Sequence, residues 1–292
     1  MPGAVQSFAD MSATNLSREK AKINLQVIRE PLTTKDSDKE SRLDMILRSD
    51  TGDQVGVVSR DRTQVSFGEL FDFVTDQLKL AEIPFKIKDN IITDKSDWFA
   101  TFVFDREFEG PDGSKLVPML IAKGSYLHKL FDGKFGTYRF VCKNGVTVGT
   151  TISGVSISAK QAGDMAQMSL RDQFELALGR FDDVTLRYGK MKREALTPSL
   201  HELVTSDRAP STIKKGTLET LATQGFIQIL DKENKVRMKL LDEEGPDAVY
   251  RVAREGTKWD LYNATTDYLS HQSRSINSMT RGYDIASALF GV

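Results

Sequence analysis

The sequence predicts an α+β fold: a helix, an antiparallel β-meander of three to four strands, a long helix and a mostly helical C-terminal region. Two observations indicate this order. An amphipathic helical pattern is followed by short apolar stretches that Asx-Gly turns separate. A segment without proline then runs over 160–193. Strands gathered in one run and helices in another are typical of α+β rather than alternating α/β domains.

Residues 1–50 are expected to form an N-terminal arm with short strands. The first part is small and polar, 22–30 has the composition of a strand, and 31–42 that of a charged loop. Residues 42–65 predict two short strands around the turn Ser49–Asp53.

A helix is predicted directly after this region. Ser66 is a preferred N-cap residue, and Glu69, three residues on, completes a capping box. Apolar residues then recur at spacings of three and four, which predicts one buried face. Its members are Phe67, Leu70, Phe71, Val74 and Leu78.

The meander follows this helix, and two Asx-Gly pairs, Asp112–Gly113 and Asn144–Gly145, mark its turns. The expected strands are short runs rich in β-branched and aromatic residues. They cover 83–93, 98–109, 116–122, 136–142 and 146–157.

The long helix over 160–193 has Ser158 as a possible N-cap, and Leu196–Ser199 ends it. Its expected buried residues are Met165, Met168, Leu176, Leu178 and Phe181. Three further helices are expected over 197–205, 214–230 and 257–271. The expected division of the chain is an arm over 1–50, an α+β core domain over 51–195 and a helical region over 196–292.

Several function classes lack their motifs. The chain has no G-x-x-x-x-G-K-[ST] loop, no G-x-G-x-x-G and no G-x-S-x-G elbow. His128, His201 and His271 are not spaced as metal ligands, and the single cysteine, Cys142, lies in an apolar strand where it packs as a small hydrophobe. No cofactor, resident metal or catalytic residue is therefore expected.

The lone cysteine, the lack of an eighteen-residue apolar run and the lack of a signal peptide predict a cytoplasmic protein outside the membrane.

Charge is unevenly distributed along the chain. Residues 114–163 hold seven bases and one acid, Asp132, a net charge of +6 in a chain whose total is −1. Aromatic residues lie between these bases. Bases that follow a phosphate backbone, with aromatic rings for stacking, are typical of proteins that bind single strands without sequence preference. The opposing interpretation is that the rings are sheet core and the lysines only solubilise.

The residues expected to bind nucleic acid come mainly from this segment. The expected phosphate contacts are Lys123, Lys129, Lys134, Arg139 and Lys143, and the expected stacking residues are Tyr126 and Tyr138. Arg274 and Arg281 lie in the tail over 274–292, whose apolar end predicts either a phosphate-contacting arm or a subunit contact. The expected partners are single-stranded nucleic acid, with DNA favoured, and further copies of the chain in a homo-oligomer.

Two other functions are alternatives. Asp105, Glu107 and Glu109 alternate and would share one face of a strand, which is the arrangement that a metal-dependent nuclease would use. Alternating acids are also common on solvent-facing strands. A non-enzymatic assembly or host-interaction protein is the third interpretation.

Two stretches resemble a phage- and plasmid-borne family known as domain of unknown function 932. Within 124–149, Val141–Gly145 matches the family's strand end V-C-x-N-G, and Gly124–Ser125 matches the preceding turn in part. Residues 257–274 are similar to the family's helix W-x-x-x-N-A-x-T-E-Y-x-D-H. The matching positions are Trp259, Asn263, Ala264, Thr266, Tyr268 and His271, while Asp267 and Ser270 stand where Glu and Asp are usual.

This resemblance implies a phage or mobile-element protein and brings no assigned activity. For the helix itself, Trp259, Leu261, Tyr262 and Leu269 are expected to pack in the core. The element order is also similar to that of single-strand annealing proteins of the Rad and Red-beta type. That likeness implies rings or filaments that hold single-stranded DNA in a basic groove.

Overall fold

The computed structural model describes residues 13–34, 37–93, 96–111, 113–139, 151–157, 170–231, 233–237, 248–271 and 276–291. The chain divides into two compact units. Unit 1 comprises Met1–Arg106, Pro118–Phe135 and Ser153–Ala177, and unit 2 comprises Glu107–Val117, Gly136–Ile152 and Leu178–Val292.

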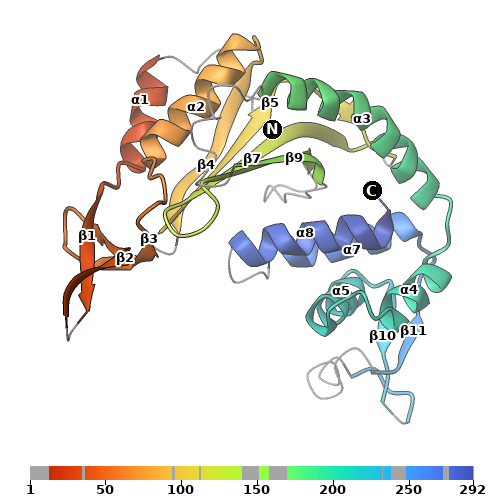
Figure 1. The fold of residues 1–292 in the computed structure, drawn as a ribbon. Coiled ribbons are helices and arrows are strands. Elements are labelled where there is room, and N and C mark those ends of the chain that lie inside the picture. The colour runs from red at the N-terminus through yellow and green to blue at the C-terminus, as the bar shows by residue number, and fades with distance from the viewer. Residues whose placement is uncertain are drawn as a thin grey trace. The chain divides into compact units, whose positions relative to one another are not determined.

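Helices and antiparallel sheets both contribute, which confirms the α+β fold (Figure 1). The helices are α1 (Ala13–Lys22), α2 (Phe67–Leu80), α3 (Leu170–Met191), α4 (Leu196–Thr205), α5 (Ser211–Thr223), α7 (Lys258–His271) and α8 (Ile276–Phe290). The strands are β1 (Val27–Thr34), β2 (Ser37–Arg48), β3 (Gln54–Ser59), β4 (Phe85–Thr93), β5 (Asp97–Phe104), β6 (Phe108–Glu109), β7 (Lys115–Ser125), β8 (Phe131–Arg139), β9 (Thr151–Ile157), β10 (Ile227–Ile229) and β11 (Tyr250–Val252).

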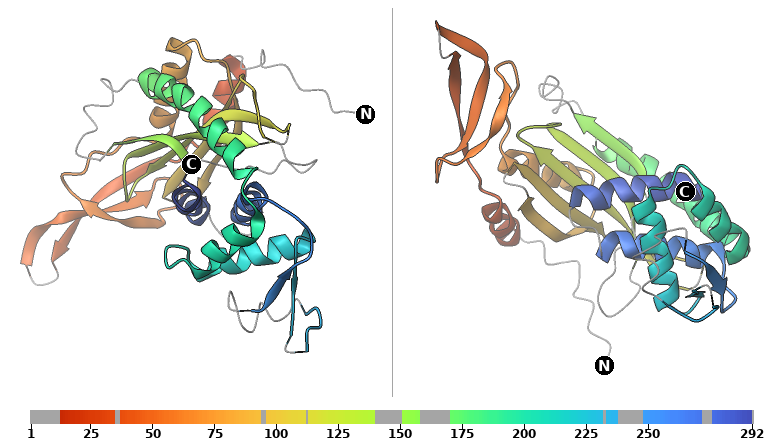
Figure 2. Two further views of the ribbon diagram at one scale, coloured as in Figure 1. Left: turned by 90° about the vertical axis from the view of Figure 1, so that its right-hand side faces the viewer. Right: turned by 90° about the horizontal axis from the view of Figure 1, so that it is seen from below.

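The predicted meander is present as a six-stranded sheet in the order β4-β5-β7-β8-β9, with β6 added to β7 (Figure 2). One predicted strand, 98–109, is wrong in extent, because β5 ends at Phe104 and only two residues resume pairing as β6. The turn that joins β6 to β7 includes Gly113, whose φ of 76° is costly for any residue with a Cβ. Asp112 and the Asn144–Gly145 pair lie outside the described residues.

A separate three-stranded sheet, in the order β1-β2-β3, precedes the meander. The predicted turn between β2 and β3 is confirmed, and Gly52 provides it with a φ of 72°. The predicted loop over 31–42 is wrong, because β1 and β2 continue as a hairpin through the pair Thr34↔Ser37. Main-chain hydrogen bonds form this hairpin, so charged side chains do not prevent it. The helix α1 is not predicted by the sequence.

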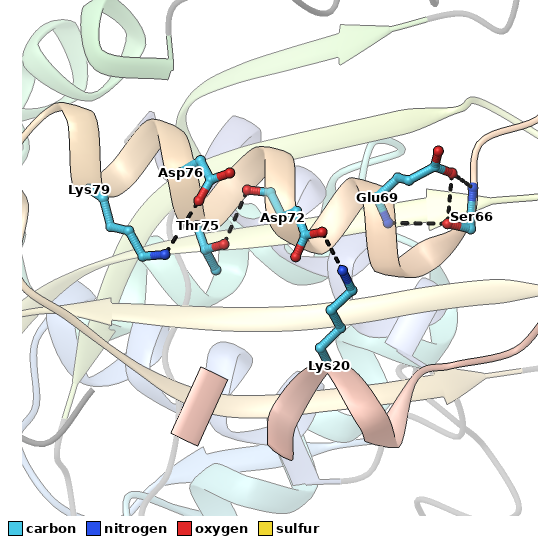
Figure 3. Close-up of polar contacts among 7 residues, drawn as sticks. All are labelled: Lys20, Ser66, Glu69, Asp72, Thr75, Asp76 and Lys79. Atoms are coloured by element: carbon cyan, nitrogen blue, oxygen red, sulfur yellow. Dashed lines mark hydrogen bonds and ion pairs between the residues drawn. The ribbon is translucent and has the colours of Figure 1, made fainter. Parts of the chain in front are cut away.

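The capping box that the sequence predicts for α2 is present (Figure 3). The backbone N–H of Glu69 donates to Ser66 Oγ at 3.2 Å, and the backbone N–H of Ser66 donates to Glu69 Oε2 at 2.7 Å. All five predicted face residues are buried. On the other side of the helix, Asp72 pairs with Lys20 of α1.

The buried face of α2 packs on one face of the large sheet. Phe71 makes ring contacts with Trp98 and Phe102 of β5, at centroid distances of 6.4 and 6.3 Å. At Gly124 of β7 a Cβ would lie 2.3 Å from Leu70 Cδ1, so a larger residue would force the Leu70 side chain to shift. These contacts form the core of unit 1.

Unit 2 is built on α7. Its buried rings, Trp259 and Tyr262, contact Tyr188 of α3 at 4.7 and 5.5 Å, and Tyr262 also contacts Phe290 of α8 at 5.3 Å. The prediction that Trp259, Leu261, Tyr262 and Leu269 pack in the core is confirmed.

Two other predictions for the C-terminal half are corrected. The predicted helix over 214–230 ends at Thr223, because Gly225 has a φ of 77° and the apolar residues after it form β10. The tail over 274–292 contains α8, in keeping with the mostly helical C-terminal region that the sequence predicts. Leu176 of α3, predicted to be buried, is 46 % exposed. Within unit 2, Val184, Tyr188 and Met191 form the buried side of α3 instead.

Candidate nucleic-acid interface

The turn that joins β7 to β8 carries the exposed base Lys129. Ser125, the last residue of β7, fixes the turn: its Oγ accepts from the backbone N–H groups of Leu127 at 3.2 Å and His128 at 3.0 Å. The backbone N–H of Tyr126 donates to the carbonyl oxygen of Ser96 at 2.9 Å. Lys129 is therefore presented on a hydrogen-bonded turn.

Lys123 and Lys134, on the two strands beside this turn, lie on one face of the sheet. Gly124 and Phe131 face α2, since Gly124 meets Leu70 and the Phe131 ring contacts Phe73 at 5.9 Å. Side chains alternate along a strand, so Lys123 and Lys134 lie on the face away from α2. Both are half-buried.

Asp132 lies on the same face as Lys134, two residues before it, and is also half-buried. The described part of the basic segment at this turn thus combines three lysines with one carboxylate. Its charge remains positive after the acid is counted.

Tyr126, expected to stack on bases, is instead part of the core. Its ring is 4 % exposed and stacks on Phe67 at 4.2 Å. Its hydroxyl donates to the carbonyl oxygen of Leu25 at 2.8 Å, and burial raises the pKa of Tyr126 to about 12. A ring enclosed in this way cannot stack on a base, so this part of the prediction is corrected.

Arg62, which sequence reasoning missed, holds the turn from behind. Its guanidinium donates from Nη2 to the carbonyl oxygen of Ser125 at 3.0 Å and to that of His128. Burial, with a smaller effect of the neighbouring Arg29, lowers the pKa of Arg62. No sequence motif indicates that Arg62 would bond to the turn of Lys129, which lies more than sixty residues later in the chain.

Two further arginines share a single carboxylate beside Arg62. Arg29 Nη2 lies 2.8 Å from Asp44 Oδ2, and Arg60 Nε lies 3.2 Å from Asp44 Oδ1. Arg29 also donates from Nη1 to the carbonyl oxygen of Arg62 at 2.8 Å. We call Arg29, Arg60 and Arg62 the arginine cluster. With Asp44 it carries two net positive charges and connects through Arg62 to the turn of Lys129.

Three of the nine predicted residues, Lys123, Lys129 and Lys134, lie on β7, on the turn after it and on β8. Tyr138 and Arg139 continue along β8, but their side chains lie outside the description, as do Lys143 and Arg274 entirely. Arg281 is exposed on α8 of unit 2. The apolar end of the tail packs within that unit, where Phe290 is 8 % exposed.

The carboxylates of the nuclease alternative do not share a strand. Asp105 follows β5, Glu107 precedes β6, and only Glu109 lies in a strand. Glu107 Oε2 pairs with Lys115 Nζ at 2.7 Å. Across the described ranges, no three His, Cys, Asp or Glu side chains gather as metal ligands would. The single face that this alternative needs is therefore not formed.

Comparison with known proteins gives one match. A family model described as "Domain of unknown function (DUF932)" matches residues 130–289, more than half of the 292 residues. No curated protein and no solved structure matches the chain. Among the described helices, none is long and apolar enough to cross a bilayer.

Proposed function

The chain belongs to the family described as domain of unknown function DUF932, and we propose that it is a phage or mobile-element protein that binds single-stranded DNA. It binds without catalysis, in the cytoplasm of the host cell. As an oligomer it protects or anneals the strands.

One observation carries this proposal: Lys123 and Lys134 share a face of the sheet, and the exposed Lys129 lies on the turn between their strands. A phosphate backbone that crosses this end of the sheet could contact all three ammonium groups. Such contacts release condensed counterions, so the affinity should fall steeply with added salt.

The arginine cluster supports the same site. Guanidinium groups bind phosphate through paired N–H donors. One of the three, Arg62, also fixes the turn, because it donates to two of the turn's carbonyl oxygens. With Tyr126 in the core, base stacking falls to Tyr138, or binding rests on phosphate contacts alone.

Sizing chromatography with light scattering separates this proposal from both alternatives. The protein is run with and without a single-stranded oligonucleotide, at low and high salt. We expect an oligomer that binds the oligonucleotide at low salt and releases it at high salt. A defined oligomer that ignores the oligonucleotide would favour the assembly role, and cleavage of a labelled strand with magnesium would favour the nuclease.

A further inference from the structure

Unit 2 contains two consecutive short helices, α4 and α5, followed by the β10–β11 hairpin (Figure 1). Only residues 206–210 join the helices. We propose that these elements form a helix-turn-helix with a β-wing that binds double-stranded DNA, with α5 in the major groove. The second helix of such motifs reads the groove, while the first crosses the backbone. This inference is independent of the lysines Lys123, Lys129 and Lys134 of the single-strand site, which belong to unit 1.

One side of α5 is fixed against α7. A Cβ at Gly216 would lie 2.2 Å from Cδ2 of Tyr268, so the helices approach as closely as a glycine allows. Beside it, Thr217 Oγ1 donates to Thr265 Oγ1 at 3.1 Å in the buried interface. The helix is thus rigidly placed, as a reading helix must be.

The side of α5 next to Gly216 is polar and not buried. Thr212, Lys215, Glu219 and Thr223 follow one another at spacings of three and four, and so form a single stripe. Lys215 Nζ lies 3.6 Å from Glu219 Oε1. Lysine and threonine side chains donate to phosphates and base edges, and a glutamate accepts from cytosine N4.

The connection between the helices has the properties of a tight turn. Ala209 is 5 % exposed and anchors it, while Arg208 is exposed and lines a pocket with Phe290 at the end of α8. Pro210 directly precedes α5, and its carbonyl oxygen accepts from the backbone N–H of Ile213 at 2.9 Å. Arg208 is therefore placed at the start of α5, where a phosphate would lie beside a helix inserted in the groove.

The hairpin provides the wing. Ile227 and Ile229 of β10 are buried, and an isolated bridge, Leu230↔Val236, closes a turn directly after β10. The exposed bases Lys235 and Arg237 lie beside this bridge. The hairpin lies on the side of α4 and α5 away from α8 (Figures 1 and 2).

Backbone pairing also joins the two ends of the motif. Ala195, just before α4, forms an antiparallel bridge with Thr257, just after the hairpin. The backbone N–H of Leu196 donates to the carbonyl oxygen of Gly256 at 2.9 Å. The two helices and the hairpin thus form one closed element.

The chemistry of this surface favours a duplex over a single strand. Between Leu196 and Thr223 the sequence has no Phe, Tyr or Trp, so His201 of α4 is the one aromatic side chain there on which an unpaired base could stack. An α-helix with polar side chains instead fits the major groove of B-DNA.

The test measures binding to a fluorescent duplex of mixed sequence and, separately, to a single-stranded oligonucleotide. We expect the double substitution Arg208→Ala with Lys215→Ala to raise the dissociation constant for the duplex about tenfold. It should also make the negative slope of log K against log salt shallower by about two, because each substitution removes the basic side chain that contacts one phosphate. Binding to the single strand should not change.

The control replaces two exposed bases of the same unit, Lys190→Ala with Arg193→Ala, and should leave duplex binding unchanged. Circular dichroism checks that both variants fold. The inference is overturned if the wild type does not bind the duplex at low salt, or if the two double variants bind it equally. Loss of single-strand binding in Lys129→Glu with Arg139→Glu, with duplex binding retained, would show that the two sites are separate.

Discussion

Individual side chains decide how the turn of the proposed single-strand site is presented. Lys129 is accessible because Ser125 and Arg62 together fix the turn that carries it. Tyr126, three residues away in sequence, stacks on Phe67 in the core. Lys129 and Tyr126 lie in the same stretch of alternating aromatic and basic residues. Composition alone therefore could not show that the Tyr126 ring is buried while Lys129 is exposed. The contact of the Tyr126 ring with Phe67 of α2 is what buries it.

At the start of α2, the Ser66 cap should contribute measurably to stability. We expect Ser66→Ala to lower the free energy of unfolding by about 1 kcal/mol, because the N–H of Glu69 loses its acceptor. Ser59→Ala, on exposed β3, is the matched control and should change little. Chemical denaturation at neutral pH measures both.

The same cap predicts a pH dependence. Hydrogen bonds from the Ser66 side chain and backbone lower the pKa of Glu69. A lowered pKa in the folded state means that this stabilisation is fully present above the ordinary glutamate pKa and is lost as the pH falls through the lowered value. The difference between Ser66→Ala and the wild type should therefore shrink in acid. A difference that grows in acid would contradict this role.

At the scale of elements, patterns with a local cause are predicted best. The capping box and the apolar spacing indicate α2 and its buried face, and turn glycines indicate the β2–β3 and β6–β7 hairpins. Elements that depend on tertiary contact are missed. Gly282 interrupts the helical pattern of α8, and the structure places it against α7, where a Cβ would lie 2.2 Å from Leu269 Cδ2. Charged β2 forms because β1 and β3 pair with it on both sides.

The close approach of α5 and α7 gives a prediction of its own. We expect Gly216→Ala to destabilise unit 2 by roughly 1–3 kcal/mol through overpacking against Tyr268, although alanine favours helix. Gly189→Ala on α3, where no atom lies within 4 Å of a Cβ, should instead stabilise slightly. Thermal unfolding of the two variants compares them. Equal effects would mean that α5 and α7 are not in close contact.

At the scale of the whole molecule, charge segregation is the signal that the sequence carries most clearly. A chain of net charge −1 concentrates +6 in residues 114–163. Contacts distant in sequence, which no spacing could indicate, add the arginine cluster next to this segment. The sequence thus predicts the basic turn but neither its support nor the helix-turn-helix of unit 2.

The most direct test of the central claim is the affinity for a single-stranded oligonucleotide, measured by fluorescence anisotropy over a range of salt concentrations. We predict that Lys129→Glu with Arg139→Glu abolishes binding and leaves the thermal unfolding curve unchanged. The control Lys22→Glu with Lys79→Glu reverses two exposed lysines of α1 and α2 and should bind as the wild type does. Unchanged affinity of the Lys129→Glu with Arg139→Glu variant at low salt would contradict the account.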